Sequence, residues 1–165
     1  LLDLTFGGSG YDLACAAASG PLIYNKNSTI RSIPKKFDPP FKSQLYFVHL
    51  NRKQNSRAGI ARYKKNMLNN REAFVSRISQ LTESILECQE IADFNSYLKE
   101  HESLVAEQIR LSVVQKALFP DYFGQTKSLG AWGGDFVLAT GNDDTPSYFK
   151  KKGFSTVLPF LEMVL

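Results

Sequence analysis

The stretch SQLYFVHL, residues 43–50, has the composition of a buried strand. It gathers aromatic and aliphatic residues in a short run without acids, lysine or arginine, which predicts a strand that is buried on both faces. The preceding segment, KKFDPPF (35–41), contains two consecutive prolines and is expected to be a loop. The following segment, NRKQNS (51–56), is polar, and a helix is expected to begin near Ser56.

The residues before this strand predict a helix and then a hairpin. Helix signals begin at Asp12 and end at the Gly20–Pro21 pair, which stops a helix. Residues 21–34, PLIYNKNSTIRSIP, contain two short strand-like runs around a turn at Lys26–Asn27.

The middle of the chain predicts two amphipathic helices. Asn69 and Glu72 form a capping-box pattern at the start of the first. Its apolar residues recur at helical spacing: Phe74, Ile78, Leu81, Ile85 and Cys88. The second helix has a similar stripe and is expected to end near 118–120; the stripe comprises Phe94, Leu98, Val105, Ile109 and Leu111. Each has a charged opposite face, which is typical of a helical layer over a sheet.

The last third of the chain returns to strands. TKSLGAWGGDFVLAT (126–140) predicts a strand, a glycine-rich turn and a second strand. Thr145 is expected to cap a short helix that starts at Pro146 and closes before Gly153. Residues 154–165 predict one or two terminal strands. The order helix, strands, helices, strands predicts the α+β class, with helices packed on an antiparallel or mixed sheet.

Composition narrows the class of protein without choosing a function. The 165 residues carry a net charge of +4, which suits nucleic acid, a membrane surface or an anionic small molecule equally. No apolar run is long enough to cross a bilayer. The two cysteines, Cys15 and Cys88, lie in apolar helical patterns and favour a reducing cytoplasm over a disulfide framework. Without CxxC pairs or histidine clusters, no zinc site is expected.

The segment GGSGYDLACAAASG (7–20) is the first that could carry chemistry. Its glycines allow a tight turn, and the N-terminus of the helix that follows would suit a phosphate group. Asp12 could serve there as a general base for a hydroxyl or simply as a helix cap. The small residues behind it would let the helix pack closely under a site.

Two further segments are candidates. KSLGAWGGD (127–135) has more glycines than a tight hairpin requires, so the loop could press against a ligand or only hold Trp132 in the core. LNRKQNSRAGIARYKKN (50–66) gathers cations at a strand-to-helix junction. These could face an anion or form a solvated basic surface.

Together these segments resemble the C-terminal half of a GHMP-superfamily small-molecule kinase, the group that includes galactokinase, homoserine kinase, mevalonate kinase and phosphomevalonate kinase. GSGYDLACA (8–16) is similar to the Gly-Ser-Gly-x-Asp helix start of its mevalonate-kinase-like branches, and closest to a bacterial subfamily with Gly-Tyr-Asp-Ile-Ala. LGAWGGDFVL (129–138) resembles the Gly-Ala-Gly-Gly-Gly loop of the family. YFVHLNRKQNS, which ends at Ser56, resembles its strand leading to a Ser/Thr at a helix start.

The resemblance implies a division of the chain and a set of roles. Residues 1–40 would be the end of the family's N-terminal domain, which is ribosomal-protein-like, and 41–165 its C-terminal domain. Asp12 matches the acid that deprotonates the substrate hydroxyl. The positions implied to contact phosphate or substrate are Ser9, Gly10, Ser56, Gly130, Ala131, Gly133 and Gly134.

Two departures from the family pattern bear on activity. Trp132 stands where the family usually has glycine, which would reshape the pocket. The family's phosphate-binding loop and an acid that helps to hold Mg²⁺ would lie upstream of the residues present, so no metal ligand is assigned. Because phosphoryl transfer depends on positioning and charge neutralisation, a chain that begins at Leu1 would be nearly inert alone.

The first hypothesis is therefore a large part of a cytoplasmic kinase that uses ATP and Mg²⁺ to phosphorylate a hydroxyl or phosphate of a small anionic metabolite, with mevalonate-pathway compounds as the substrate class. The second is a non-catalytic protein on the same fold that binds a metabolite or a partner; a base at Asp12 argues against it. The third is an RNA-binding domain, which the basic junction permits, although the sequence has no Lys/Arg-Gly-Phe pattern of the RNA-recognition type.

Overall fold

The computed structural model describes residues 9–26, 30–53, 56–66, 71–130, 132 and 135–164. They belong to two compact units: one runs from the N-terminus to Asp38 and includes Val164, and the other is Pro39–Met163. In the described residues, no helix is both long enough and apolar enough to span a membrane.

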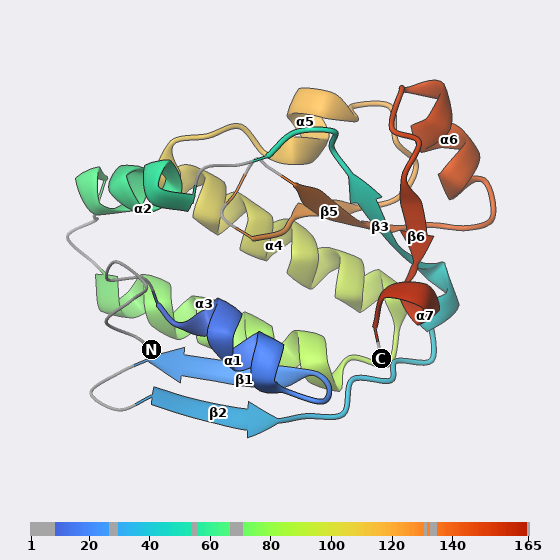
Figure 1. Cartoon of the computed structure of the whole chain (residues 1–165). Helices are drawn as coiled ribbons and strands as arrows, with labels where there is room; N and C mark the ends of the chain where they lie inside the picture. Colours follow the sequence, from blue (N-terminus) through green and yellow to red (C-terminus); the bar gives the residue numbers. More distant parts are fainter. Residues whose placement is uncertain are drawn as a thin grey trace. The chain divides into compact units, whose positions relative to one another are not determined.

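The first unit contains a short helix and a hairpin (Figure 1). Helix α1 is Tyr11–Ala17, and strands β1 (Leu22–Lys26) and β2 (Ile30–Pro34) pair antiparallel, with Tyr24 opposite Ser32. The predicted helix and hairpin are confirmed, whereas Asn27 of the predicted turn lies outside the described residues. The predicted close packing of the small residues is wrong, because no residue of α1 is buried, and Cys15 is exposed.

The second unit is built on a four-stranded antiparallel sheet in the order β4-β5-β3-β6. Its strands are β3 (Leu45–His49), β4 (Thr126–Ser128), β5 (Phe136–Thr140) and β6 (Val157–Pro159). The stretch 43–50 thus forms the predicted strand, and it is an inner one. Its predicted burial on both faces is confirmed only in part, because Phe47 and His49 are half-buried. Val48 lies opposite both Val137 and Val157, and its side chain is fully buried.

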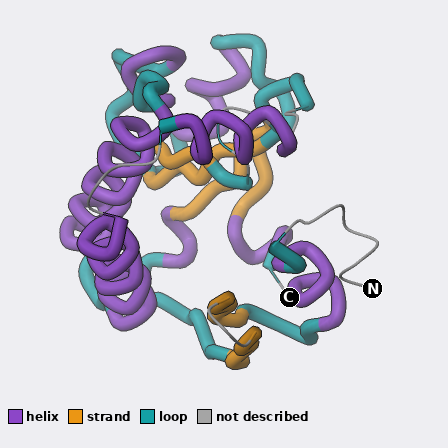
Figure 2. Tube along the Cα trace, turned by 90° about the vertical axis from the view of Figure 1, so that its left-hand side faces the viewer, coloured by secondary structure: helices purple, strands orange, loops and turns teal. Residues whose placement is uncertain are grey.

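The helices of the second unit cover this sheet and one another. They are α2 (Ser56–Lys65), α3 (Arg71–Glu87), α4 (Ile91–Ile109), α5 (Val114–Leu118), α6 (Thr145–Lys151) and α7 (Phe160–Met163), with a 3₁₀ turn, η2, at Lys42–Gln44. Helix α4 packs against β4, and α3 packs against α4 (Figures 1 and 2). The predicted α+β class, with helices on an antiparallel sheet, is confirmed.

Three boundaries differ from the predictions. Helix α4 ends at Ile109 and does not reach residues 118–120, because Arg110 turns left-handed at φ 54° and α5 follows as a separate helix. Thr145 is the first residue of α6 and does not cap it; its buried hydroxyl accepts a hydrogen bond from the Asn142 N–H. The C-terminal segment forms one strand and then α7, so a second terminal strand is absent from the described residues. The capping residue Asn69 lies outside them.

The two outward-facing amides of the edge strand β4 bond to side chains from the helices above it. The Thr126 N–H donates to Gln115 Oε1 of α5 at 3.0 Å, and the Ser128 N–H donates to Glu102 Oε2 of α4 at 3.0 Å. An unpaired sheet edge exposes backbone groups to unwanted pairing, so these side chains replace a missing neighbouring strand.

Gly124 precedes β4 at a point where no side chain fits. A Cβ there would lie 1.8 Å from the Thr140 carbonyl oxygen, which is backbone and cannot move aside. The Gly124 carbonyl also accepts a hydrogen bond from Gln115 Nε2 at 2.8 Å. The close contact with the Thr140 carbonyl therefore requires glycine at this position.

We expect Gly124→Ala to destabilise the second unit by at least about 2 kcal/mol through overpacking. Chemical denaturation followed by the fluorescence of the single tryptophan, Trp132, reports on this unit. The matched control is Gly20→Ala, where no atom lies within 4 Å of the added Cβ, and its midpoint should stay close to wild type. Equal midpoints for the two variants would contradict the close contact.

Candidate functional site

The N-terminal turn places Asp12 on an exposed helix start. Gly10 adopts φ 81° and is the residue that precedes α1, and the Ser9 hydroxyl accepts a hydrogen bond from the Tyr11 N–H at 3.2 Å. Asp12 lies within the first turn, so it is not the residue that caps the helix. Its carboxylate is exposed and therefore open to another molecule.

Two tyrosines hold this turn, and the motif analysis missed both. Tyr24 of β1 donates a hydrogen bond from its hydroxyl to the Ser9 carbonyl, and its ring meets the Tyr11 ring edge-on at 5.9 Å. A hydrogen bond with the Cys15 side chain, followed by burial, raises the pKa of Tyr11 to about 12. The spacing of Tyr11 and Cys15 at i and i+4 was readable from the sequence, whereas the contact with Tyr24 needs the hairpin.

The glycine-rich loop between β4 and β5 contains two left-handed positions. Gly130 has φ 61° and Trp132 has φ 58°. A left-handed conformation is natural for glycine and costs any other residue roughly 1–2 kcal/mol. Trp132 therefore occupies a glycine-like backbone position, the one where the resembled family usually has glycine. The predicted site residues Ala131, Gly133 and Gly134 lie outside the described residues.

A buried acid, Glu102, lies beneath the start of this loop. Its carboxylate has no exposed surface and accepts three hydrogen bonds: from the Ser128 N–H and hydroxyl, both at 3.0 Å, and from the Val114 N–H at 3.3 Å. It thus joins α4, β4 and the start of α5. Sequence reasoning missed it, although its spacing of four residues from both Leu98 and Ala106 already put it on the buried face of α4.

Beside Glu102 lie a lysine and a histidine with shifted pKa values. Lys127 Nζ donates to the Ser128 carbonyl at 3.0 Å and lies 5.9 Å from the centre of the Trp132 ring. Burial lowers the pKa of Lys127, against an opposing effect of Glu102. Burial, and then the charge of Lys127, lower the pKa of His101 to about 4. This lowered pKa leaves the ring neutral near pH 7, and its buried Nδ1 has no hydrogen-bond partner among the described residues.

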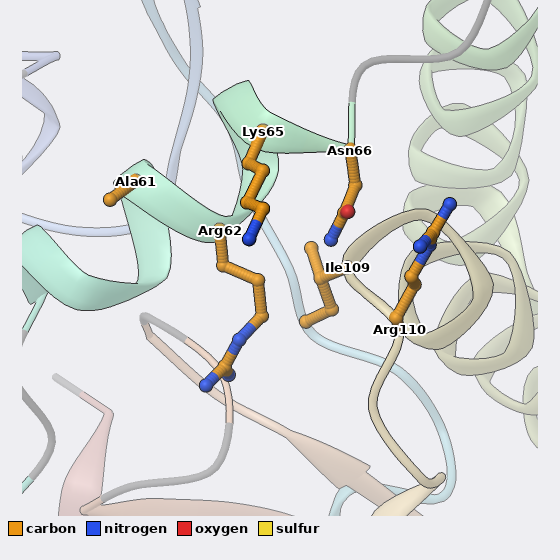
Figure 3. A pocket seen from close by; sticks show the side chains of 6 residues that line it. All are labelled: Ala61, Arg62, Lys65, Asn66, Ile109 and Arg110. Carbon is orange, nitrogen blue, oxygen red and sulfur yellow. The ribbon is translucent and has the colours of Figure 1, made fainter.

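The basic junction lies on α2 and the loop before it. Ser56 is the first residue of α2, as predicted, but its side chain is not among the described ones. Towards the other end of α2, Arg62 and Lys65 line a cavity of about 390 Å³ together with Arg110 (Figure 3). The sequence predicted a basic run at this place, but it could not show that Arg110 joins it from α4.

The predicted residues that the structure describes are divided between the two units. Ser9, Gly10 and Asp12 lie in the first unit, and Ser56 and Gly130 lie in the second. No group of three or more His, Cys, Asp or Glu side chains within the described residues could hold a metal ion.

We expect Glu102→Ala to destabilise the protein by at least about 3 kcal/mol, because three buried donors lose their acceptor. Glu107→Ala, an exposed acid on the same helix, is the matched control and should shift the free energy of unfolding by less than about 0.5 kcal/mol. Glu102→Gln keeps one acceptor oxygen and should fall between the two. Urea titration measures all three, and a neutral Glu102→Ala variant would show that these bonds contribute little.

His101 should make stability depend on pH. Its folded pKa of about 4 lies below the value of 6.5 for the unfolded chain. The unfolded state therefore binds a proton first as the pH falls, so this contribution to stability is complete above pH 6.5 and is lost towards pH 4. In His101→Gln, the slope of unfolding free energy between pH 6.5 and 4.5 should be smaller by up to about 1 kcal/mol per pH unit after solvent screening. An unchanged slope would show that His101 does not titrate in this range.

Comparison of the chain with protein-family models gives no match, and the search of curated proteins gives no significant match. The family resemblance therefore stands on the quoted residues themselves: the segment 8–16, the loop 129–138 and Ser56.

Proposed function

We propose that the chain is a large part of an ATP-dependent small-molecule kinase of the GHMP type. One observation carries the proposal: the segment Gly-Ser-Gly-Tyr-Asp turns at Gly10 and leaves Asp12 exposed in the first turn of a helix. That is the position from which a carboxylate could take the proton of a substrate hydroxyl. The glycine-like conformation of Trp132 supports the likeness of the second glycine segment to the family loop.

The role assigned to Asp12 is that of a general base. A carboxylate within hydrogen-bond reach of a hydroxyl accepts its proton as the oxygen attacks the γ-phosphorus of ATP, and the bond from that phosphorus to the β–γ bridging oxygen breaks, releasing ADP. Mg²⁺ would neutralise charge on the phosphates. No ligand of the ion is named, and we assign to this chain the base and the substrate contacts.

A second function, binding of an anionic metabolite without catalysis, is favoured by the cation-lined cavity between α2 and α4. Such a protein would need the cavity and would have no use for Asp12 as a base. The variant Asp12→Asn therefore distinguishes the two functions.

In the full-length protein, Asp12→Asn should lower the rate of ATP consumption by roughly 10²–10⁴-fold while substrate affinity is retained, as expected for loss of a general base. The assay measures ADP release with Mg²⁺ against small alcohols and phosphorylated alcohols, mevalonate included. Asp144→Asn, an exposed acid in the loop before α6, is the matched control and should turn over at the wild-type rate.

Unchanged turnover in Asp12→Asn would remove the base assignment. Absence of any substrate-stimulated ADP release in wild type, together with binding of an anionic metabolite, would favour the second function.

A further inference from the structure

Cations from two distant segments surround one cavity within the unit Pro39–Met163. The cavity measures about 390 Å³ and lies between the end of α2 and the end of α4. None of the described residues that line it is acidic: they are Ala61, Arg62, Lys65, Asn66, Ile109 and Arg110 (Figure 3).

The side chains differ in how they face the cavity. Arg62, Lys65 and Asn66 extend from α2 in the same direction, toward the level of Ile109 (Figure 3). Ile109 is buried and supplies an apolar wall. Arg110 lies on the other side of Ile109, and its side chain extends upward in the view, toward the level of Asn66 (Figure 3). Arg62 and Lys65 thus line the cavity on one side of Ile109, and Arg110 lines it on the other.

Several carbonyls at the ends of both helices have partners other than these cations. The Asn66 N–H already donates to the Arg62 and Tyr63 carbonyls, and the Asn66 carbonyl accepts from Gln108 Nε2 at 2.7 Å. At the end of α4, the Arg110 N–H donates to the Glu107 carbonyl at 3.2 Å, and the Leu111 N–H donates to the Ala106 carbonyl at 2.9 Å. These carbonyls are satisfied by backbone N–H groups and by Gln108, and not by the side chains of Arg62, Lys65 or Arg110.

The three cations also have no acidic partner among the described residues. The ion pairs found there join Lys36 to Asp38, Arg77 to Glu100 and Lys152 to Asp121. Like charges that gather around a partly enclosed space repel one another, and a bound anion relieves that repulsion. The hydrogen bond from Gln108 to Asn66 keeps the two helix ends in the arrangement that gathers them.

We infer that this cavity binds the phosphate group of a small phosphorylated molecule. The Arg62 guanidinium can donate two parallel hydrogen bonds to phosphate oxygens, and Lys65 adds a point charge. The volume lies at the small end of the range for ligand pockets, and Ala61 and Ile109 offer apolar contact to the carbon part of the ligand. That this ligand is the substrate of the kinase rests on the proposed function, whereas phosphate binding itself does not.

Calorimetric titration of the full chain with inorganic phosphate and pyrophosphate tests the inference. The double variant Arg62→Gln/Lys65→Gln should lose at least about tenfold in affinity, because both charge-assisted contacts disappear. The double variant Lys53→Gln/Lys64→Gln removes the same charge from exposed positions that do not line the cavity, and it should lose less than about twofold. Arg110→Gln should fall between them.

Equal losses in the two double variants would overturn the inference in favour of a diffuse basic surface, and so would the absence of phosphate binding in wild type. Tighter binding of single-stranded RNA than of pyrophosphate, lost equally in both double variants, would also overturn it. Phosphate binding without ATP consumption would support the phosphate site in this cavity and contradict the proposed kinase activity. The double variant Arg62→Gln/Lys65→Gln could also consume ATP with an unchanged affinity for substrate. That result would support the kinase activity and show that the cavity is not its substrate site.

Discussion

The second unit depends on one buried carboxylate. Glu102 accepts hydrogen bonds from the backbone and hydroxyl of Ser128 and from the first amide of α5, and it reaches both from the middle of α4. Burying a carboxylate is costly unless several donors surround it. Here the donors are groups that the fold would otherwise leave unpaired: an outward amide of an edge strand and the free amide of a helix start. The hydrogen bonds therefore offset the desolvation cost of the carboxylate and that of the donors as well.

The same edge explains why the polar residues around it are buried. Gln115 accepts from the other outward amide of β4, and Lys127 runs along the strand to the Ser128 carbonyl and the Trp132 ring. Covering a strand edge with helices in this way partly desolvates Lys127 and His101, and burial is the largest cause of the lowered pKa of each. The lowered pKa values at the start of the glycine-rich loop thus result from the way in which α4 and α5 cover the edge strand β4.

Backbone conformation at two non-glycine residues shapes the places where a ligand could bind. Arg110 turns left-handed directly after α4, which separates α5 from it and leaves the arginine in the wall of the cation-lined cavity. Trp132 turns left-handed in the loop after β4. Non-glycine residues adopt this conformation when surrounding contacts outweigh its cost, and such positions cluster at functional sites. Arg110 lines the cavity with Arg62 and Lys65, and Trp132 lies beside Lys127.

The sequence by itself determined most of the elements and their order, though not α5 or α7. The apolar run at 43–50, the helical spacing from Phe74 to Cys88 and the glycine-rich break at 129–134 are local patterns, and local patterns report periodicity and turns. It also pointed to Asp12 and to the basic run on α2. The end of α4 at Ile109 was missed, because neither glycine nor proline marks it: Arg110 adopts the left-handed conformation there, and the N–H groups of Arg110 and Leu111 cap the last turn. Tertiary structure decided other features. It alone brought Glu102 to Ser128 and joined Arg110 to Arg62 and Lys65, since these pairs are far apart in the chain and meet only after the helices pack.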